Sequence, residues 1–163
     1  MDYLTYYKNK KIVIPGGNGF LGSHLVGKLK NISCKVFVPK RKDGIDFRRY
    51  KDCMRYLGEV KPHIVINCAA NQGGIAYFVN KEADIFLDNM LMGTYLMEVS
   101  QKVGVKKFIN IVAACSYPGY LEKREMNEED YWNGEVHESI FSLGFPRKAS
   151  TVYGLALKKQ HNF

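Results

Sequence analysis

The chain has 163 residues, of which 46% are hydrophobic and 13% aromatic, so its composition excludes a disordered protein and suits one folded domain over residues 1–163. No apolar run reaches the roughly 20 residues of a membrane-spanning helix, and residues 1–11 lack the apolar segment of a secretory signal. The formal net charge is +8, but the basic residues are spread along the sequence without a zinc-ligand spacing or a ribonucleoprotein motif. We therefore expect neither a nucleic acid nor a membrane as a partner.

The cysteines and histidines give no reason to expect a metal site. The four cysteines are widely spaced and form no C-x-x-C pair, and the four histidines show no metal-ligand spacing. Reduced thiols are the default for such a pattern, so we expect a cytoplasmic protein.

Apolar, β-branched runs alternate with helical patterns along the whole chain. We predict a strand at 11–15, a helix at 20–30, a strand at 34–39, a helix at 48–60, a strand at 63–70, a helix at 82–104, a strand at 106–114, and a last helix that reaches the chain end. The run at 63–70 is continuously apolar, as expected for a strand that is covered on both faces. This order predicts an α/β fold with a doubly wound, Rossmann-like parallel sheet.

The first candidate site is the stretch "PGGNGFLG" between the first strand and the first helix. Gly16, Gly19 and Gly22 allow a tight turn that a pyrophosphate can approach, and Phe20 and Leu21 begin the helix whose free N–H groups favour an anion. A plain glycine-rich turn is the alternative, but the position after a strand and before a helix favours dinucleotide binding.

The end of the second strand indicates which dinucleotide binds. An acidic residue there would bind a ribose 2′-hydroxyl, whereas a basic residue accommodates a 2′-phosphate. The sequence has Lys40, Arg41 and Lys42, with no acid before Asp43, so NADP is favoured over NAD. The alternative is an ordinary exposed basic loop.

Several longer segments resemble the extended short-chain dehydrogenases/reductases, and among them the GDP-L-fucose synthases and related nucleotide-sugar epimerase/reductases. The matching segments, in the family's order, are "GGNGFLGSHLV", "KPHIVINCAANQGGIAYF", "FLDNMLMGTYLMEVSQKVGVKKFINI", "CSYP" and "EEDYWNG". The resemblance implies an NADP-linked oxidoreductase or epimerase that acts on a GDP-sugar. It also implies cofactor contacts at Ala69, Ala70 and Asn71, and a contact of Asp46 with the adenine.

The catalytic positions depart from this family's pattern. The family uses a serine or threonine, a tyrosine and a lysine, in which the tyrosine exchanges a proton as hydride moves. An ungapped comparison through "WNG" places Ala113, Leu143 and Arg147 at these three positions. Cys115 matches an acid/base position of the family's epimerisation, and a buried structural thiol is the equally weighted alternative.

A second interpretation moves the catalytic residues to Ser116, Tyr153 and Lys158. It requires about ten inserted residues, and it places Lys158 about 140° around the helix from Tyr153. We therefore favour the first placement, in which Tyr153 belongs to a packing helix.

Members of the resembled family continue for a comparable length, so we expect the C-terminal substrate domain to be largely missing. A fragment, a truncated product and a chain that pairs with another chain all stay open. Two functions follow: the NADP-binding part of a nucleotide-sugar epimerase/reductase with degraded or absent catalysis, or a non-catalytic cofactor-binding domain that acts with a partner chain. We also expect a homo-oligomer, because the resemblance implies that helix 82–104 and the last helix pack between subunits.

Overall fold

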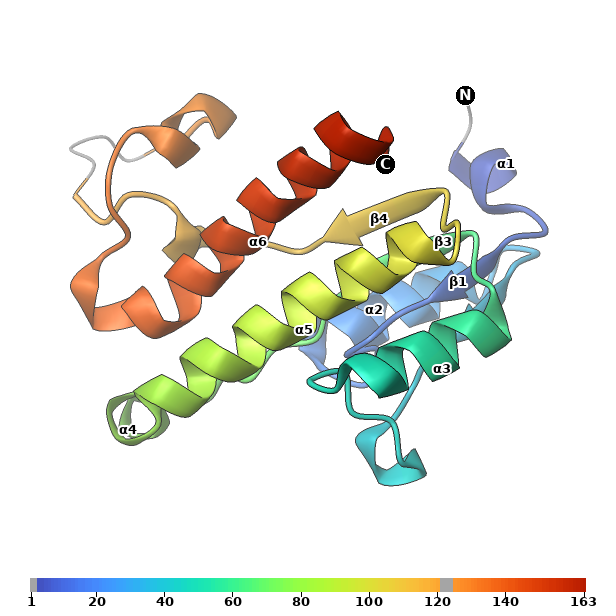
Figure 1. Cartoon of the computed structure of the whole chain (residues 1–163), viewed down its shortest axis with the longest axis horizontal. Helices are drawn as coiled ribbons and strands as arrows, with labels where there is room; N and C mark the ends of the chain where they lie inside the picture. Colours follow the sequence, from blue (N-terminus) through green and yellow to red (C-terminus); the bar gives the residue numbers. More distant parts are fainter. Residues whose placement is uncertain (1–2, 121–124) are drawn as a thin grey trace.

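The computed structural model describes residues 3–120 and 125–163, and a four-stranded parallel sheet in the order β2-β1-β3-β4 runs through it (Figure 1). The register pairs Ile12 with both Val36 and Ile64, and pairs Val65 with Phe108. The α/β class with a parallel, Rossmann-like sheet is thereby confirmed. The strands are β1 (Lys11–Val13), β2 (Lys35–Phe37), β3 (Ile64–Asn67) and β4 (Lys107–Asn110).

Helices cover both faces of the sheet. Helices α3 and α5 lie on one face, α2 lies on the other, and α6 packs along α5 in the same direction (Figure 1). Short 3-10 turns lie at 41–43, 114–116, 128–132 and 138–140. The α-helices are α1 (Tyr3–Tyr7), α2 (Phe20–Leu29), α3 (Tyr50–Val60), α4 (Ile75–Asn80), α5 (Glu82–Lys102) and α6 (Phe141–His161).

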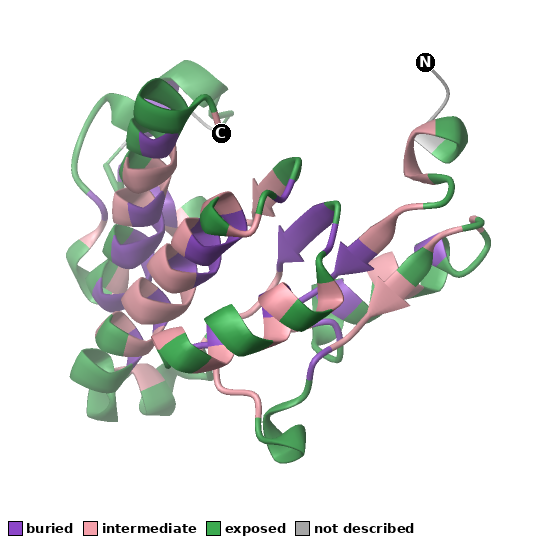
Figure 2. Ribbon diagram, turned by 45° about the vertical axis from the view of Figure 1, so that its right-hand side comes forward, coloured by how far each residue is buried: buried purple, intermediate pink, exposed green. Residues whose placement is uncertain are grey.

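The core has one apolar layer on each side of the sheet, as the alternation of side chains along a strand requires. Val13 and Val65 face α3 and α5, where they meet Leu57 and Leu96. Their strand neighbours, among them Ile64, point to the opposite face and pack against α2. The buried positions of β1 and β3 are purple in Figure 2. Burial on both faces explains why these strands are continuously apolar in the sequence.

The strand order places a topological switch point between β1 and β3. The connection from β1 leads to β2 on one side, whereas β3 and β4 lie on the other side of β1. In open parallel sheets, ligands bind outside the carboxyl ends of the strands at such a point. The residues after β1 and β3 are therefore placed to form a site.

Most differences from the sequence prediction concern boundaries. The strand predicted at 63–70 ends at Asn67, because the amide of Cys68 turns to donate to the carbonyl of Pro15. The strand predicted at 106–114 ends at Asn110, and Ala114–Ser116 forms a 3-10 turn. Helices α1 and α4 were missed, since five and six residues are too few to show a helical period.

Among the described helices, none combines the length and the hydropathy that a membrane crossing requires.

Candidate cofactor-binding site

A cavity of about 1220 Å³ opens at the carboxyl ends of the strands, at the switch point between β1 and β3. Its wall is built from the loops that follow all four strands, together with residues of α4, α5 and α6. This volume is somewhat above the roughly 300–1,000 Å³ of most small-molecule pockets, so there is room for a ligand as large as a dinucleotide. The predicted residues in its lining are Gly16, Gly19, Phe20, Leu21, Gly22, Arg41, Lys42, Asp46, Ala69, Ala70, Asn71, Ala113, Leu143 and Arg147.

The glycine turn leaves its backbone open towards the cavity. Gly16 has a φ of +75°, and a Cβ added there would lie 2.6 Å from the amide nitrogen of Ala69. A Cβ on Gly22 would overlap the carbonyl oxygen of Gly16. Gly19 precedes α2 with extended backbone, and no side chain caps this helix. The first N–H groups of α2 therefore remain available to an anion in the cavity.

The loop after β2 brings basic and acidic groups together. Arg41 and Lys42 are exposed at the cavity, and the guanidinium of Arg41 lies 3.5 Å from a carboxylate oxygen of Asp46. The same carboxylate accepts from Nη2 of Arg48 at 2.6 Å and from its Nε at 2.9 Å. The carboxylate of Asp46 is therefore bound by two arginine side chains, Arg41 and Arg48.

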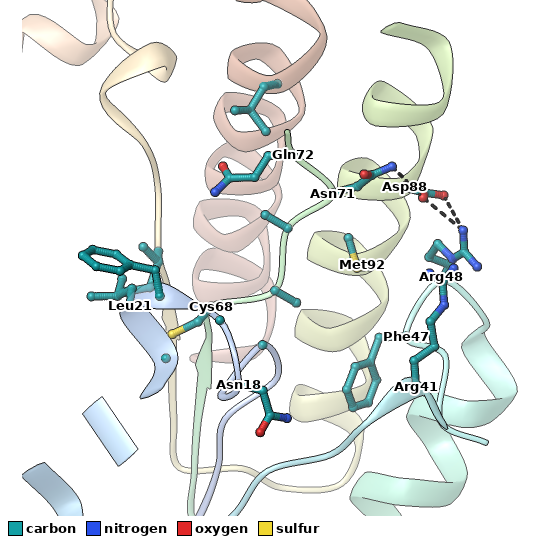
Figure 3. A pocket seen from close by; sticks show the side chains of 18 of the residues that line it. Asn18, Leu21, Arg41, Phe47, Arg48, Cys68, Asn71, Gln72, Asp88 and Met92 are labelled. Atoms are coloured by element: carbon teal, nitrogen blue, oxygen red, sulfur yellow. Dashed lines mark hydrogen bonds and ion pairs between the residues drawn. The ribbon is translucent and has the colours of Figure 1, made fainter. Parts of the chain in front are cut away.

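A polar network continues from this loop along one side of the cavity (Figure 3). Nη1 of Arg48 donates to both oxygens of Asp88 on α5, at 3.0 and 3.2 Å. Asp88 also accepts from the side-chain amide of Asn71, at 2.9 Å, and the hydroxyl of Tyr77 donates to Asn71 at 2.8 Å. The network thus joins the loop after β2, the loop after β3, α4 and α5.

The far end of the cavity is lined by Ala113, Leu143 and Arg147. Arg147 is buried, and its guanidinium donates to the carbonyl oxygens of Ala69 at 2.8 Å and Ile111 at 3.3 Å. Burial lowers the pKa of this guanidinium below its ordinary value. Arg147 therefore ties the ends of β3 and β4 to α6, while Leu143 presents only an apolar side chain.

The sequence of this site matches a family model described as "NAD dependent epimerase/dehydratase family" over residues 12–139, which is more than half of the chain. The chain belongs to this family. It is 33% identical over 152 residues to the GDP-L-fucose synthase of Sinorhizobium fredii, and the match covers 93% of this chain and 48% of that protein. The chain therefore spans about half the length of this curated relative.

Solved structures show the same fold. The GDP-L-fucose synthetase from Naegleria fowleri bound to NADP has a TM-score of 0.81 and 25% identity, covering 94% of this chain and 45% of that chain. The GDP-mannoheptose C4 reductase from Campylobacter jejuni with NADP bound has a TM-score of 0.87 and 24% identity, covering 94% of this chain and 48% of that chain. The four-stranded sheet and its helices thus correspond to somewhat less than half of each of these longer chains.

The three residues of the second catalytic interpretation, Ser116, Tyr153 and Lys158, lie outside the cavity lining. Tyr153 is half-buried on α6, where burial and the nearby carboxylate of Glu98 raise the pKa of its hydroxyl. Lys158 is exposed near the end of the same helix, and Ser116 is fully buried. None of Tyr153, Lys158 and Ser116 lines the cavity.

Cys115 lies beside the cavity and outside its lining. Burial raises the pKa of its thiol, and the positive charge of Arg147 opposes that rise. A Cβ added to Gly144 would overlap the carbonyl oxygen of Cys115, so α6 and the 3-10 turn are in close contact there. This contact fixes how Leu143 and Arg147 face the cavity.

Three polar residues of this region were not identified from the sequence: Arg48, Asp88 and Asn89. Asn89 is buried in α5, donates to the carbonyl of Asn71 at 2.8 Å and accepts from its amide at 3.1 Å. One signal was present, because Asp88 and Asn89 interrupt an apolar helical run and both residues are poor helix formers. No group of three or more histidine, cysteine or acidic side chains in the described part of the chain could hold a metal ion.

Proposed function

We propose that this chain binds NADP(H) in the cavity at the switch point, as the nucleotide-binding part of a protein related to GDP-sugar epimerases and reductases. One observation carries the proposal: the cavity joins an uncapped helix start, a glycine turn packed too tightly against backbone for a Cβ at Gly16 or Gly22, and a basic loop. The pyrophosphate would lie at Gly16, Gly19 and Gly22, over the first N–H groups of α2. The bound cofactor would supply hydride transfer.

The loop after β2 supports the preference for NADP(H). Arg41 and Lys42 offer two positive groups to a 2′-phosphate, and the acid of this loop that lines the cavity, Asp46, is already bound to Arg41 and Arg48. The carboxylate of Asp46 is held by Arg48 and remains in the lining, where the adenine would lie. Ala69, Ala70 and Asn71 would follow the cofactor towards its nicotinamide end.

The side chains at the end of the cavity where the nicotinamide would lie support the proposal that this chain lacks the proton donor of its family. Leu143 has no dissociable proton and Ala113 has no hydroxyl, so neither can serve a carbonyl or an alcohol of a sugar. Arg147 keeps a positive charge there, but its donors are engaged with backbone carbonyls. General acid catalysis alone contributes about 10² to 10⁴ in rate. We therefore propose a cofactor-binding chain without the reductase step, whose natural ligands include a nucleotide sugar if a partner completes the site.

Assembly belongs to the same proposal. Exposed apolar side chains follow the outer surfaces of α5 and α6, including Leu87, Phe145 and Leu155 at 55%, 41% and 53% exposure. The ring of Phe145 stacks between those of Phe86 and Phe141. Burying such a surface favours a homo-oligomer or pairing with another chain.

The test is isothermal titration calorimetry with NADPH and with NADH, followed by a turnover assay with a GDP-keto-sugar. We expect NADPH to bind more tightly than NADH and the isolated chain to show no turnover. If neither dinucleotide binds, the proposed cofactor site is refuted. If NADPH binds and the GDP-keto-sugar is turned over, the cofactor site is supported and the proposed loss of catalysis is refuted.

A further inference from the structure

The edge of the sheet opposite the candidate cofactor site is rich in lysine. Because all four strands are parallel, the residues at which they begin meet at this edge. Lys11 of β1 lies in register with Lys35 of β2, and β4 begins with Lys107 beside Ile64. We call this surface the lysine edge, and its members are Lys8, Lys10, Lys11, Lys30, Lys35, Lys61, Lys106 and Lys107.

Contacts between these segments show that the lysines are close in space. The amide of Lys35 donates to the carbonyl of Lys10, and the amide of Lys106 donates to the carbonyl of His63. The ring of Tyr6 lies between two ammonium groups, with Nζ of Lys10 at 3.6 Å and Nζ of Lys107 at 5.4 Å from its centroid. Six of the eight lysines are exposed, and Lys10 and Lys11 are half-buried. Residues spread over a hundred positions of sequence therefore form one surface.

The positive charge of this surface is not neutralised by the described part of the chain. None of the eight lysines forms an ion pair with a carboxylate of residues 3–120 or 125–163. On α5, the carboxylate of Glu98 is already paired with Lys102, at 2.7 Å. At the opposite edge, Arg48 is paired with two aspartates and Arg41 with one, while Lys40 and Lys42 form no ion pair within the described residues. The lysine edge is therefore one concentrated source of positive potential on this chain of net charge +8.

We propose that the lysine edge binds the phosphate backbone of a nucleic acid without sequence specificity. The expectation of no nucleic-acid partner rested on the spread of basic residues along the sequence and on the lack of a zinc spacing or a ribonucleoprotein motif. The parallel topology changes the first of these grounds, because it brings eight of the basic residues to one edge. The proposal goes beyond the cofactor site, because it concerns the other edge of the sheet and other residues.

The composition of the surface favours a nucleic acid over a protein or a membrane. Cores of protein–protein interfaces are depleted in lysine and enriched in aromatic residues and arginine. Membrane-surface helices pair their basic face with a broad apolar face. The lysine edge has ammonium groups, no arginine, and a single strongly exposed large apolar residue among its described neighbours, Leu4 at 45%. Protein–DNA interfaces are instead polar and strongly positive.

The size of the edge also fits. Strands lie about 4.8 Å apart, so the distance from β2 to β4 across the sheet is about 14 Å. A DNA duplex carries one phosphate charge per about 1.7 Å of axis, which gives about eight charges over that distance. Because those charges belong to both strands and surround the duplex, only part of them faces the edge, and the eight lysines are more than enough to meet that part.

Fluorescence anisotropy with a labelled DNA duplex tests the proposal, using the full chain at about 50 to 200 mM KCl. We expect the chain to bind the duplex, with the logarithm of the binding constant falling linearly as the logarithm of the salt concentration rises. The variant K35E/K106E reverses two charges at the two sides of the edge, and it should reduce the magnitude of this slope by about 2. The matched control is R49E/K51E, which makes the same change in net charge at the start of α3, near the carboxyl ends of the strands.

The outcomes separate the alternatives. Loss of affinity in K35E/K106E together with retention in R49E/K51E supports the lysine edge, provided that both variants keep the circular dichroism spectrum of the parent. Equal losses in the two variants would show an effect of net charge and overturn the site. No binding at the lowest salt concentration would overturn it too. Equal or tighter binding of poly-glutamate or of phosphatidylserine vesicles would replace the nucleic acid by an acidic protein or a membrane surface.

Discussion

Replacing Arg147 by methionine tests whether this buried cation holds α6 to the sheet. Arg147 is 6% exposed and donates to the carbonyl of Ala69 at 2.8 Å, with longer contacts to Ile111 and Asn89. Methionine fills a similar apolar volume, so the variant removes the hydrogen bonds and leaves little cavity. The change therefore isolates the polar contribution of this side chain.

Two opposing terms determine the magnitude. A hydrogen bond to a charged donor contributes about 1.5–3 kcal/mol, and a carbonyl left without a partner costs about 1–3 kcal/mol. Removing the cation also removes the cost of its burial, which is evident in the lowered pKa of Arg147. Since one of the three contacts is short, we expect a loss of about 1–3 kcal/mol in the free energy of unfolding. For a chain of this size, the melting temperature should fall by about 2–12 °C.

Thermal unfolding followed by circular dichroism measures the change, and the adjacent Lys148 supplies the control. Lys148 is half-buried and donates to the carbonyl of Gly134 at 2.9 Å on the exposed side of α6. K148M loses the same charge and a hydrogen bond that is open to solvent, and it should cost about 0.5–1.5 kcal/mol, less than R147M. A melting temperature of R147M equal to or above that of the parent would refute the reasoning, because the cost of burying the cation would then exceed its bonds.

Three further predictions concern the cofactor, Tyr153 and assembly. R41A should weaken NADPH about tenfold and leave NADH unchanged in calorimetry, since it removes a 2′-phosphate partner; an equal effect on both would contradict this. Y153F should leave the Kd for NADPH within about twofold of the parent, and a larger loss would return Tyr153 to the site. Light scattering at micromolar concentration should show a dimer or larger species, which L155E should dissociate; a monomeric parent would exclude an assembly that depends on this surface.

The parallel sheet and the glycine turn could be predicted because their signals are local. The apolar runs gave each strand, and the position of Gly16 between a strand and a helix indicated the turn. Strand ends could not be predicted with the same accuracy. The sequence does not show that the amide of Cys68 leaves the ladder to reach Pro15.

The parts of the site that escaped the sequence depend on contacts between distant segments. Arg48 and Asp88 are 40 positions apart, and their ion pair exists only because α5 packs beside the start of α3. The lysine edge was missed for the same reason, since its members come from three strands of the sheet and from the segments that flank them. By contrast, the ungapped alignment with the resembled family put Leu143 at the tyrosine position, and the structure places Leu143 in the cavity lining.

The pairing of β1 with β3 has a consequence for how the chain folds. The amide of Lys11 donates to the imidazole of His63, 52 positions away, so this ladder closes a long loop. The entropy cost of that closure is about 3.5 kcal/mol if the loop is a flexible chain. Ordering of the intervening α2, β2 and α3 shortens the effective loop. The centre of the sheet therefore depends on its flank forming first, and φ-value measurements should find transition-state structure in α2 and β2 before it appears in β3.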